Sequence, residues 1–203
     1  MFLSLDGVDG VGKTTQIERL VAWLESHGRR VVTCRDPGGT PLGEMLREAL
    51  LHSGPDRPIG ATAEMLMYMA SRAQLVEQVI RPALDDGAVV VSDRFLLANL
   101  VYQSHAGGLD REEVASVGRI AVRGAMPDRV LLLDLDPAEA DRRRGREPDR
   151  MESRGDDYRR KVRQGFLVEA KRSPDTITVI DASKSIDEVW GQIQAAVEPL
   201  LEA

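Results

Sequence analysis

Eight residues near the N-terminus, Gly7-Val8-Asp9-Gly10-Val11-Gly12-Lys13-Thr14, constrain the fold of this 203-residue chain more than any other segment. They match the pattern G-x-x-x-x-G-K-[ST], and they lie between an apolar run at residues 2–5 and an amphipathic helical pattern. Glycines let backbone N–H groups curl around an anion, and the following helix points its positive end at the same place. The octapeptide therefore predicts a phosphate-binding loop between a strand and a helix.

Two side chains of the loop have predicted roles of their own. Lys13 supplies a mobile positive charge for the outer phosphates of a nucleoside triphosphate, and the hydroxyl of Thr14 can ligate Mg²⁺. The alternative is a glycine-rich turn that binds nothing. Chance matches to the pattern arise roughly a few times per thousand such chains, and the correct flanking segments make them rarer still. We therefore expect residues 7–15 to bind a nucleoside triphosphate.

Four further segments have the short, β-rich apolar pattern of buried parallel strands: residues 30–34, 88–93, 130–136 and 176–181. Helical patterns separate them, which predicts a three-layer α/β fold with a five-stranded parallel sheet flanked by helices. No repeat or linker divides residues 1–203, so we expect a single domain. Because ligands collect at the carboxyl ends of parallel strands, the residues that end these strands are the candidates for function.

A helix is predicted over residues 62–81, with one buried apolar face. The residues expected on that face are Met65, Leu66, Met69, Leu75, Val76 and Val79. Methionines at helical spacing fill cores more often than they bind ligands, so we assign them to packing.

The composition excludes several classes of function. A net charge of −6 argues against nucleic acid as the main partner, because duplex-binding proteins usually carry a basic face. No apolar run approaches the length of a membrane span, and no signal peptide precedes the loop. The single cysteine, Cys34, fits a reducing compartment and is expected to be a buried, unreactive thiol. The chain is expected to be cytoplasmic.

The densest charge cluster spans residues 141–150 and contains five arginines, Arg142, Arg143, Arg144, Arg146 and Arg150. A solvated loop is the default interpretation of such a run. A nucleic-acid-binding arm is a second interpretation, but it lacks interleaved aromatic residues. A third interpretation is a basic lid at about residues 141–153, since phosphoryl transfer needs charge neutralisation between two phosphates. Because the same chain contains a phosphate-binding loop, we favour the interpretation of this arginine cluster as a lid.

The strand end at Asp93-Arg94 narrows the class of phosphate-loop protein. A GTPase would need an Asn-Lys-x-Asp segment, which the chain lacks, and motor or transporter ATPases usually end this strand in Asp-Glu. Asp93 can help to hold Mg²⁺, whereas Arg94 suits the phosphate of an acceptor. An acceptor phosphate is already ionised near neutral pH, so no general base is required. The three histidines, His27, His52 and His105, are accordingly expected to be surface residues.

These and other segments together resemble the bacterial thymidylate kinase family. The segments are residues 7–15, Arg35-Asp36-Pro37-Gly38-Gly39-Thr40, Arg72-Ala73-Gln74, Ser92-Asp93-Arg94-Phe95, Tyr102-Gln103, Asp149-Arg150-Met151-Glu152 and Ile180-Asp181-Ala182-Ser183. The resemblance covers nearly the whole chain in order, and the R-x-P-G-G-T and D-R-x-E segments are more specific than the phosphate loop alone. It implies a P-loop kinase fold, transfer of the γ-phosphoryl group of ATP to dTMP with Mg²⁺, and a homodimer.

The resemblance also implies a role for particular residues. Those implied to be catalytic are Lys13, Arg94, Asp9, Arg143 and Arg146. Those implied to bind ATP are Gly7, Val8, Asp9, Gly10, Val11, Gly12, Lys13, Thr14, Thr15, Asp181 and Ser183. Those implied to bind dTMP are Asp9, Tyr68, Arg72, Arg94, Asn99, Tyr102 and Gln103, with Tyr68 stacking on thymine, Arg72, Asn99 and Gln103 reading its edge, and Tyr102 favouring deoxyribose. Thr14, Asp93 and Glu152 are implied to support the metal.

The chain departs from the family pattern in several places. Asp36 stands where glutamate is common, Tyr68 stands where phenylalanine is common, and Phe95 replaces a tyrosine. Gly10 stands where some relatives place an arginine, which makes the lid the expected source of catalytic positive charge. The pair Gly145-Arg146 reverses the customary order, so the lid arginine that reaches the phosphoryl group stays open. Another nucleoside or nucleotide kinase with a different acceptor is the alternative function, and a non-catalytic nucleotide sensor is a third.

Overall fold

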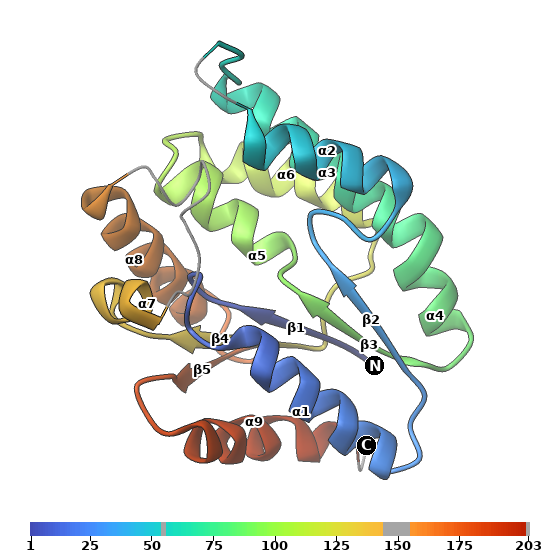
Figure 1. Ribbon diagram of the computed structural model, residues 1–203. Coiled ribbons are helices and arrows are strands. Elements are labelled where there is room, and N and C mark those ends of the chain that lie inside the picture. The colour runs from blue at the N-terminus through green and yellow to red at the C-terminus, as the bar shows by residue number, and fades with distance from the viewer. Residues whose placement is uncertain (54–55, 144–154, 202–203) are drawn as a thin grey trace.

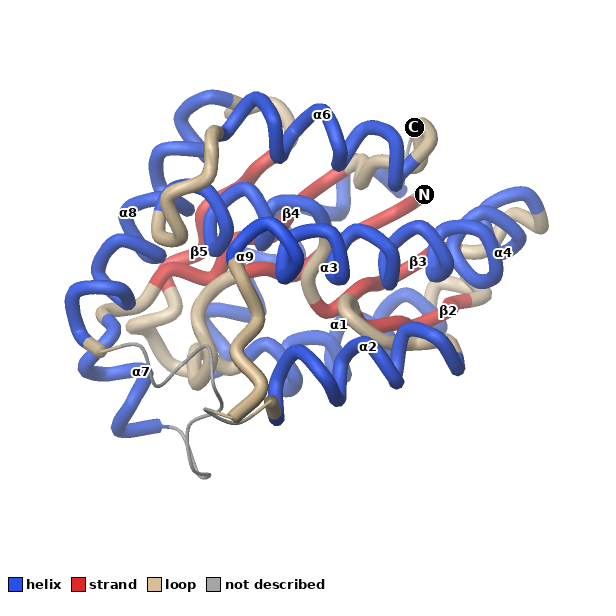
Figure 2. Tube along the Cα trace, turned by 90° about the horizontal axis from the view of Figure 1, so that it is seen from above, coloured by secondary structure: helices blue, strands red, loops and turns tan. Residues whose placement is uncertain are grey.

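A computed structural model describes residues 1–53, 56–143 and 155–201 (Figure 1). Five parallel strands form one sheet in the order β2-β3-β1-β4-β5 and lie side by side across Figure 2. Their bounds are β1 Phe2–Asp6, β2 Val31–Arg35, β3 Val89–Asp93, β4 Arg129–Asp134 and β5 Ile177–Asp181. The prediction of a five-stranded parallel α/β sheet is confirmed.

Helices cover both faces of this sheet (Figure 1). Those described are α1 Lys13–Ser26, α2 Pro41–His52, α3 Ala61–Leu75, α4 Arg81–Asp85, α5 Leu96–Asn99, α6 Arg111–Val122, α7 Pro137–Arg143, α8 Asp156–Arg172 and α9 Ile186–Leu201. Two π-helices, η1 Val76–Ile80 and η2 Leu100–His105, continue α3 and α5. None of the described helices is long and apolar enough to cross a membrane.

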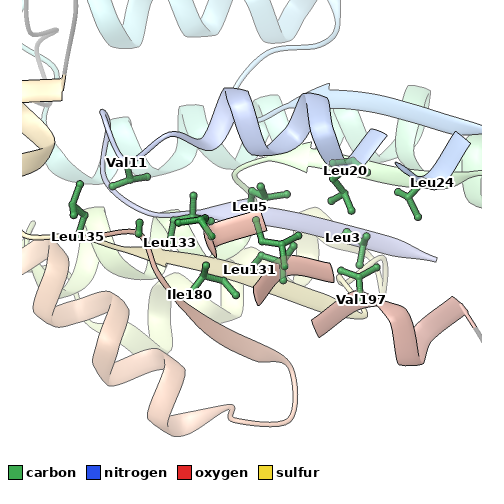
Figure 3. Packing of buried hydrophobic residues seen from close by; sticks show 14 of the residues in the cluster. Leu3, Leu5, Val11, Leu20, Leu24, Leu131, Leu133, Leu135, Ile180 and Val197 are labelled. Atoms are coloured by element: carbon green, nitrogen blue, oxygen red, sulfur yellow. The ribbon is translucent and has the colours of Figure 1, made fainter. Parts of the chain in front are cut away.

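The core has one layer on each side of the sheet. On one face, Leu3, Leu5 and Leu131 pack against α1 and α9 through fully buried leucines, isoleucines and valines (Figure 3). On the other face, alternate residues of the same strands, such as Phe2 and Val90, pack against α3, α4 and α6. The central strands β1, β3 and β4 are thus buried on both sides, which explains their nearly continuous hydrophobic pattern.

The strand predicted over 130–136 ends two residues early, at Asp134. The carboxylate of Asp136 accepts the backbone N–H of Ala138 at 3.0 Å, and Pro137 begins α7. Asp136 therefore serves as the start of a helix, because an N-terminal acceptor followed by proline is a strong helix-initiating signal.

The helix predicted over 62–81 is found as α3, η1 and α4, and it extends to Asp85. Met65, Met69, Leu75 and Val76 are buried as expected. Leu66 is 49% exposed, so its assignment to the core was wrong. The π-turns of η1 precede Pro82, which has no N–H to offer the carbonyl of Gln78, and this accounts for the local widening of the helix.

Candidate active site

The phosphate loop leaves the end of β1 and enters α1 as predicted. Gly12 has a φ of 96° and caps the N-terminus of α1, and Gly10 has a φ of 87°. A Cβ on Gly10 would collide with the backbone oxygen of Ala140 in α7, so a side chain cannot be accommodated there without movement. Thr14 and Thr15 are exposed on the first turn of α1, where their hydroxyl groups are accessible.

Lys13 folds back over the loop that precedes it. Its Nζ donates to the carbonyl oxygens of Gly7 at 3.2 Å and Val8 at 3.1 Å, and lies 3.6 Å from a carboxylate oxygen of Asp9. The side chain is only 7% exposed. Burial, reinforced by the positive charge of Arg94, lowers the pKa of Lys13. The ammonium group is therefore poorly solvated, so an incoming phosphate gives it a stronger partner than the carbonyl oxygens.

Arg94 connects the loop to the end of β3. Its Nη1 donates to the carbonyl oxygen of Gly7 at 2.7 Å, and its Nη2 lies 2.9 Å from a carboxylate oxygen of Asp9. The guanidinium carbon lies 5.5 Å from the centre of the Tyr102 ring. Burial disfavours the charge, but Asp9, Tyr102 and Asp93 together raise the pKa of Arg94 well above its usual range. Arg94 has a φ of 68°, which is costly for a residue other than glycine and is typical of functional positions.

Two strand-end carboxyl groups lie next to this cluster. Asp6 is fully buried, and burial raises its pKa to about 6 against the lowering effect of Arg94 and Lys13. The Oδ1 atoms of Asp6 and Asp93 are buried and have no hydrogen-bond partner among the described residues. Buried carboxylate oxygens of this kind are costly unless a ligand or an ordered water satisfies them.

The residues present fit a magnesium ion that takes few ligands from the protein. The part of the chain that the structure describes contains no group of three His, Cys, Asp or Glu side chains placed to hold a metal. Mg²⁺ bound to a nucleotide keeps several waters and uses phosphate oxygens, so one hydroxyl and one nearby carboxylate are sufficient. Thr14 and Asp93 have those groups. The third implied residue, Glu152, lies outside the described residues.

A cavity beside Arg94, which we name the tyrosine cavity, brings the predicted dTMP-binding residues together. All seven line it: Asp9, Tyr68, Arg72, Arg94, Asn99, Tyr102 and Gln103. They come from the loop, from α3, from the end of β3 and from the α5–η2 segment. One wall is apolar and aromatic while others present cations and amides, which suits a planar base attached to a phosphate.

Arg72 is buried and makes several contacts with the protein, in addition to lining the tyrosine cavity. Its side chain is 1% exposed, and its Nε donates to Asp36 at 2.5 Å. Its Nη2 donates to the carbonyl oxygen of Phe95 at 3.3 Å, and the guanidinium carbon lies 5.3 Å from the centre of the Phe95 ring. The short side chain of Asp36 therefore has a direct partner. Its remaining oxygen, Oδ1, is buried without a partner among the described residues.

Sequence reasoning missed five residues that line the tyrosine cavity: Asp36, Pro37, Arg47, Leu51 and Ala98. Arg47 matters most because it adds a second cation. Burial and the nearby charge of Arg35 lower the pKa of Arg47, and it donates to the carbonyl oxygen of Pro37 at 2.8 Å. One signal was present in the sequence. Thr40 caps α2 through a hydrogen bond to the N–H of Gly43, so the R-x-P-G-G-T segment opens a helix that carries Arg47 into the site.

A second cavity, which we name the loop cavity, lies on the other side of the phosphate loop. It is lined by Gly10, Val11, Gly12, Thr15, Gln16, Arg143, Ala182, Lys184, Ser185, Ile186 and Val189. Asp181 and Ser183 do not line it. Both are exposed, and Asp181 accepts hydrogen bonds from the backbone and the hydroxyl of Ser183 at 3.0 and 2.6 Å. They shape the turn, while their neighbours Ala182 and Lys184 form the cavity wall.

Arg143 belongs to the predicted lid and is the last residue described before residue 144. Its Nη1 donates to the carbonyl oxygen of Ala182 at 2.8 Å, and its Nη2 pairs with Glu139. Arg143 and Ala182 both line the loop cavity. The remainder of the predicted lid, including Arg146, falls within residues 144–154, outside the described residues.

One histidine does not have the predicted position. His27 and His52 are exposed, but the side chain of His105 is 22% exposed and lies 2.7 Å from Glu169. Glu169 is buried and also accepts two hydrogen bonds from Arg111 at 2.8 and 2.7 Å. The prediction of a surface residue was wrong for His105, since it helps to tie η2 to α6 and α8.

Comparison with known proteins agrees with this geometry. The family model described as thymidylate kinase matches residues 5–193. A thymidylate kinase of Bifidobacterium longum subsp. infantis is 48% identical over 203 residues, covering 99% of this chain and 87% of the relative. A thymidylate kinase of Rhodopirellula baltica is 51% identical over 197 residues, covering 97% of this chain and 79% of the relative.

A solved structure gives the same result. The crystal structure of thymidylate kinase from Ehrlichia chaffeensis superposes with a TM-score of 0.78 at 27% identity, covering 97% of this chain and 98% of that one. The chain therefore belongs to the thymidylate kinase family, the enzymes that phosphorylate dTMP to dTDP.

Proposed function

We propose that the enzyme transfers the γ-phosphoryl group of MgATP to the 5′-phosphate of dTMP at the junction of its two cavities, with Arg94 as the bridging residue. The observation that carries this proposal is that Arg94 lines the tyrosine cavity while its Nη1 contacts the backbone of the phosphate loop. A cation at that junction can neutralise charge on donor and acceptor phosphates together. Phosphoryl transfer is driven mainly by such positioning and electrostatic stabilisation.

The acceptor phosphate needs no general base. Its second pKa is about 6, so its oxygen is already a nucleophile at neutral pH. It would lie against Arg94, with Arg47 as a second partner on α2. The oxygen attacks the γ-phosphorus, the bond from that phosphorus to the β,γ-bridging oxygen breaks, and ADP leaves. Lys13 follows the charge as it moves to the leaving oxygen.

The nucleoside of dTMP would fill the aromatic part of the tyrosine cavity. Tyr68 is half-buried on its wall and suits stacking on the base, while Arg72 and Asn99 supply hydrogen-bonding groups for its edge. Tyr102 lies under Arg94 and would crowd the space next to the sugar, which would disfavour a 2′-hydroxyl group. Asp9 faces the same space and can accept from a 3′-hydroxyl.

Magnesium and the lid complete the proposal. Mg²⁺ would be held by the hydroxyl of Thr14 and, through water, by Asp93, and when bound it neutralises charge on the β- and γ-phosphates. ATP would extend from the loop into the loop cavity, where Arg143 and Lys184 lie. Further arginines of the predicted lid, Arg146 among them, would supply the remaining positive charge.

A homodimer is part of the same proposal. Helices α2, α3 and α6 pack together and each exposes a large apolar side chain: Met45 is 71%, Leu66 is 49% and Ile120 is 74% exposed. Exposed large apolar side chains on neighbouring helices favour burial against a second copy. A cytoplasmic location is supported by Cys34, whose thiol is free and whose pKa burial raises to about 12.

The test is ADP formation from MgATP with a panel of acceptors, namely dTMP, dUMP, dCMP, dGMP and thymidine. The proposal expects dTMP to be the best acceptor and thymidine to be inactive. Size-exclusion chromatography with light scattering, applied to the wild-type chain and to Ile120→Glu, checks the dimer. A monomeric wild-type chain would remove that part of the proposal alone.

A further inference from the structure

A buried glutamate outside the lining of the tyrosine cavity is hydrogen-bonded to a residue that lines it. Glu64, in the first turn of α3, is 2% exposed and does not line the cavity. One of its carboxylate oxygens accepts from Nε2 of Gln103 at 3.1 Å. Gln103 and its neighbour Asn99 both line the cavity, and both are buried.

The three side chains form a relay with a defined direction. The Oε1 of Gln103 accepts from Nδ2 of Asn99 at 2.8 Å. The Oδ1 of Asn99 is buried and has no partner among the described residues. An amide has one donor end and one acceptor end, whereas an ionised carboxylate only accepts. Glu64 therefore turns the NH₂ group of Gln103 toward itself, which turns the NH₂ group of Asn99 toward Gln103 and leaves Asn99 with a free acceptor.

We infer that Glu64 is a positioning residue that sets the polarity of the base-reading edge, so that Asn99 presents an acceptor to a base with a ring N–H. This inference rests on the proposed binding of dTMP in the tyrosine cavity. Thymine has a donor at N3, which matches a free amide oxygen. Cytosine has an acceptor at N3, which would meet the oxygen of Asn99 with no hydrogen between them.

Replacing Glu64 with glutamine removes the fixed end of the relay. A glutamine at this position can offer either its oxygen or its NH₂ group to Gln103, so both amides can rotate together and present a donor at Asn99. The E64Q enzyme is then expected to gain affinity for a base that accepts at N3, while dTMP loses little. A gain of binding is the informative signal, because general damage to the fold cannot produce it.

The best pair of ligands is dTMP and 5-methyl-dCMP, which share the sugar, the phosphate and the ring methyl group. Calorimetric titration with wild-type and E64Q enzyme should show the dTMP to 5-methyl-dCMP affinity ratio falling about tenfold or more, through tighter 5-methyl-dCMP binding. The matched control is Glu169→Gln, since Glu169 is also a buried helical glutamate but accepts from Arg111 and not from an amide of the tyrosine cavity. Its ratio should equal that of the wild type.

An unchanged ratio in E64Q, or equal weakening of both ligands, would overturn the inference. Should E64Q not fold, Gln103→Met cuts the same relay and should give the same gain of 5-methyl-dCMP binding, and its absence would equally refute the role of Glu64. Failure of the proposed function looks different, because the wild-type enzyme would then not bind dTMP at all.

Discussion

The guanidinium of Arg94 lies 2.9 Å from the carboxylate of Asp9, and this ion pair joins the phosphate loop to the tyrosine cavity. Asp9 comes from the loop that follows β1, and Arg94 directly follows the neighbouring strand β3. The parallel register aligns Leu5 with Asp93, so the residues that follow both strands meet at one edge of the sheet. Donor and acceptor sites therefore share a single charged contact.

Replacing Arg94 should weaken the use of the acceptor dTMP and leave the binding of the donor ATP nearly unchanged. Arg94→Ala is expected to raise the KM for dTMP and lower kcat, together reducing kcat/KM by about a hundredfold or more, because a charge-stabilising contact is lost in the transition state. The affinity for ATP should change little. Arg123→Ala is the matched control, since Arg123 also has a positive φ, of 48°, but does not line the tyrosine cavity. Full activity of R94A would refute the assignment.

Removing the loop lysine should stop transfer without unfolding the protein. Lys13→Met keeps the apolar stem and removes the charge that follows the phosphates, so kcat should fall by about a thousandfold or more. Steady-state kinetics and a thermal unfolding curve measure the two effects. Lys171→Met, at an exposed position of α8, should retain wild-type activity. A K13M enzyme within tenfold of wild type would contradict the role given to Lys13.

Gly10 tests the packing of the loop against α7. Gly10→Ala forces a Cβ onto the backbone oxygen of Ala140, in addition to the strain of a positive φ. The affinity for ATP should fall, and the free energy of unfolding should decrease by more than in Gly87→Ala. Gly87 has a similar φ of 74° with nothing near its Cβ, so that variant reports backbone strain of about 1 kcal/mol alone. Equal losses in G10A and G87A would show that the contact with Ala140 is unimportant.

The buried carboxyl of Asp6 should make stability depend on pH. Burial raises its pKa from 3.8 in the unfolded chain to about 6 in the folded protein. Because the folded state binds the proton of Asp6 more tightly than the unfolded chain does, protonation of Asp6 stabilises the folded protein. This stabilisation is fully present at low pH and is lost as the pH rises through 6. The difference corresponds to about 3 kcal/mol. Urea unfolding measures the free energy of unfolding of the wild type and of Asp6→Asn at pH 4 and pH 7. Between these pH values, the free energy of Asp6→Asn should rise relative to that of the wild type by roughly that amount. The same pH dependence in both proteins would contradict the raised pKa.

The sheet and the core of the site were predictable because their signals are local. Continuous apolar runs identify β1 to β5, and the loop pattern together with Asp93-Arg94 identifies the junction of donor and acceptor. The seven residues expected around dTMP do line one cavity. The sequence was sufficient to predict these residues, because each of them lies in or next to a segment with a recognisable motif.

Other features depend on contacts between distant segments, which no local pattern reports. Glu64 and Gln103 are 39 residues apart, and their hydrogen bond exists only because α3 packs beside η2. Glu169 and His105 are 64 residues apart and pair in the same way. The exposure of Leu66 was misjudged for a related reason, because helical periodicity gives a face but does not show how much of it other elements cover.

The most direct measurement of the central claim compares ADP formation from MgATP with dTMP, dUMP and thymidine as acceptors. The single methyl group that distinguishes dTMP from dUMP is worth about 1–3 kcal/mol in an apolar pocket, so dUMP should react at roughly a tenth of the dTMP rate or less. Thymidine has no phosphate for Arg94 and should not react. Equal turnover with thymidine and dTMP, or ATP turnover independent of any acceptor, would contradict the account.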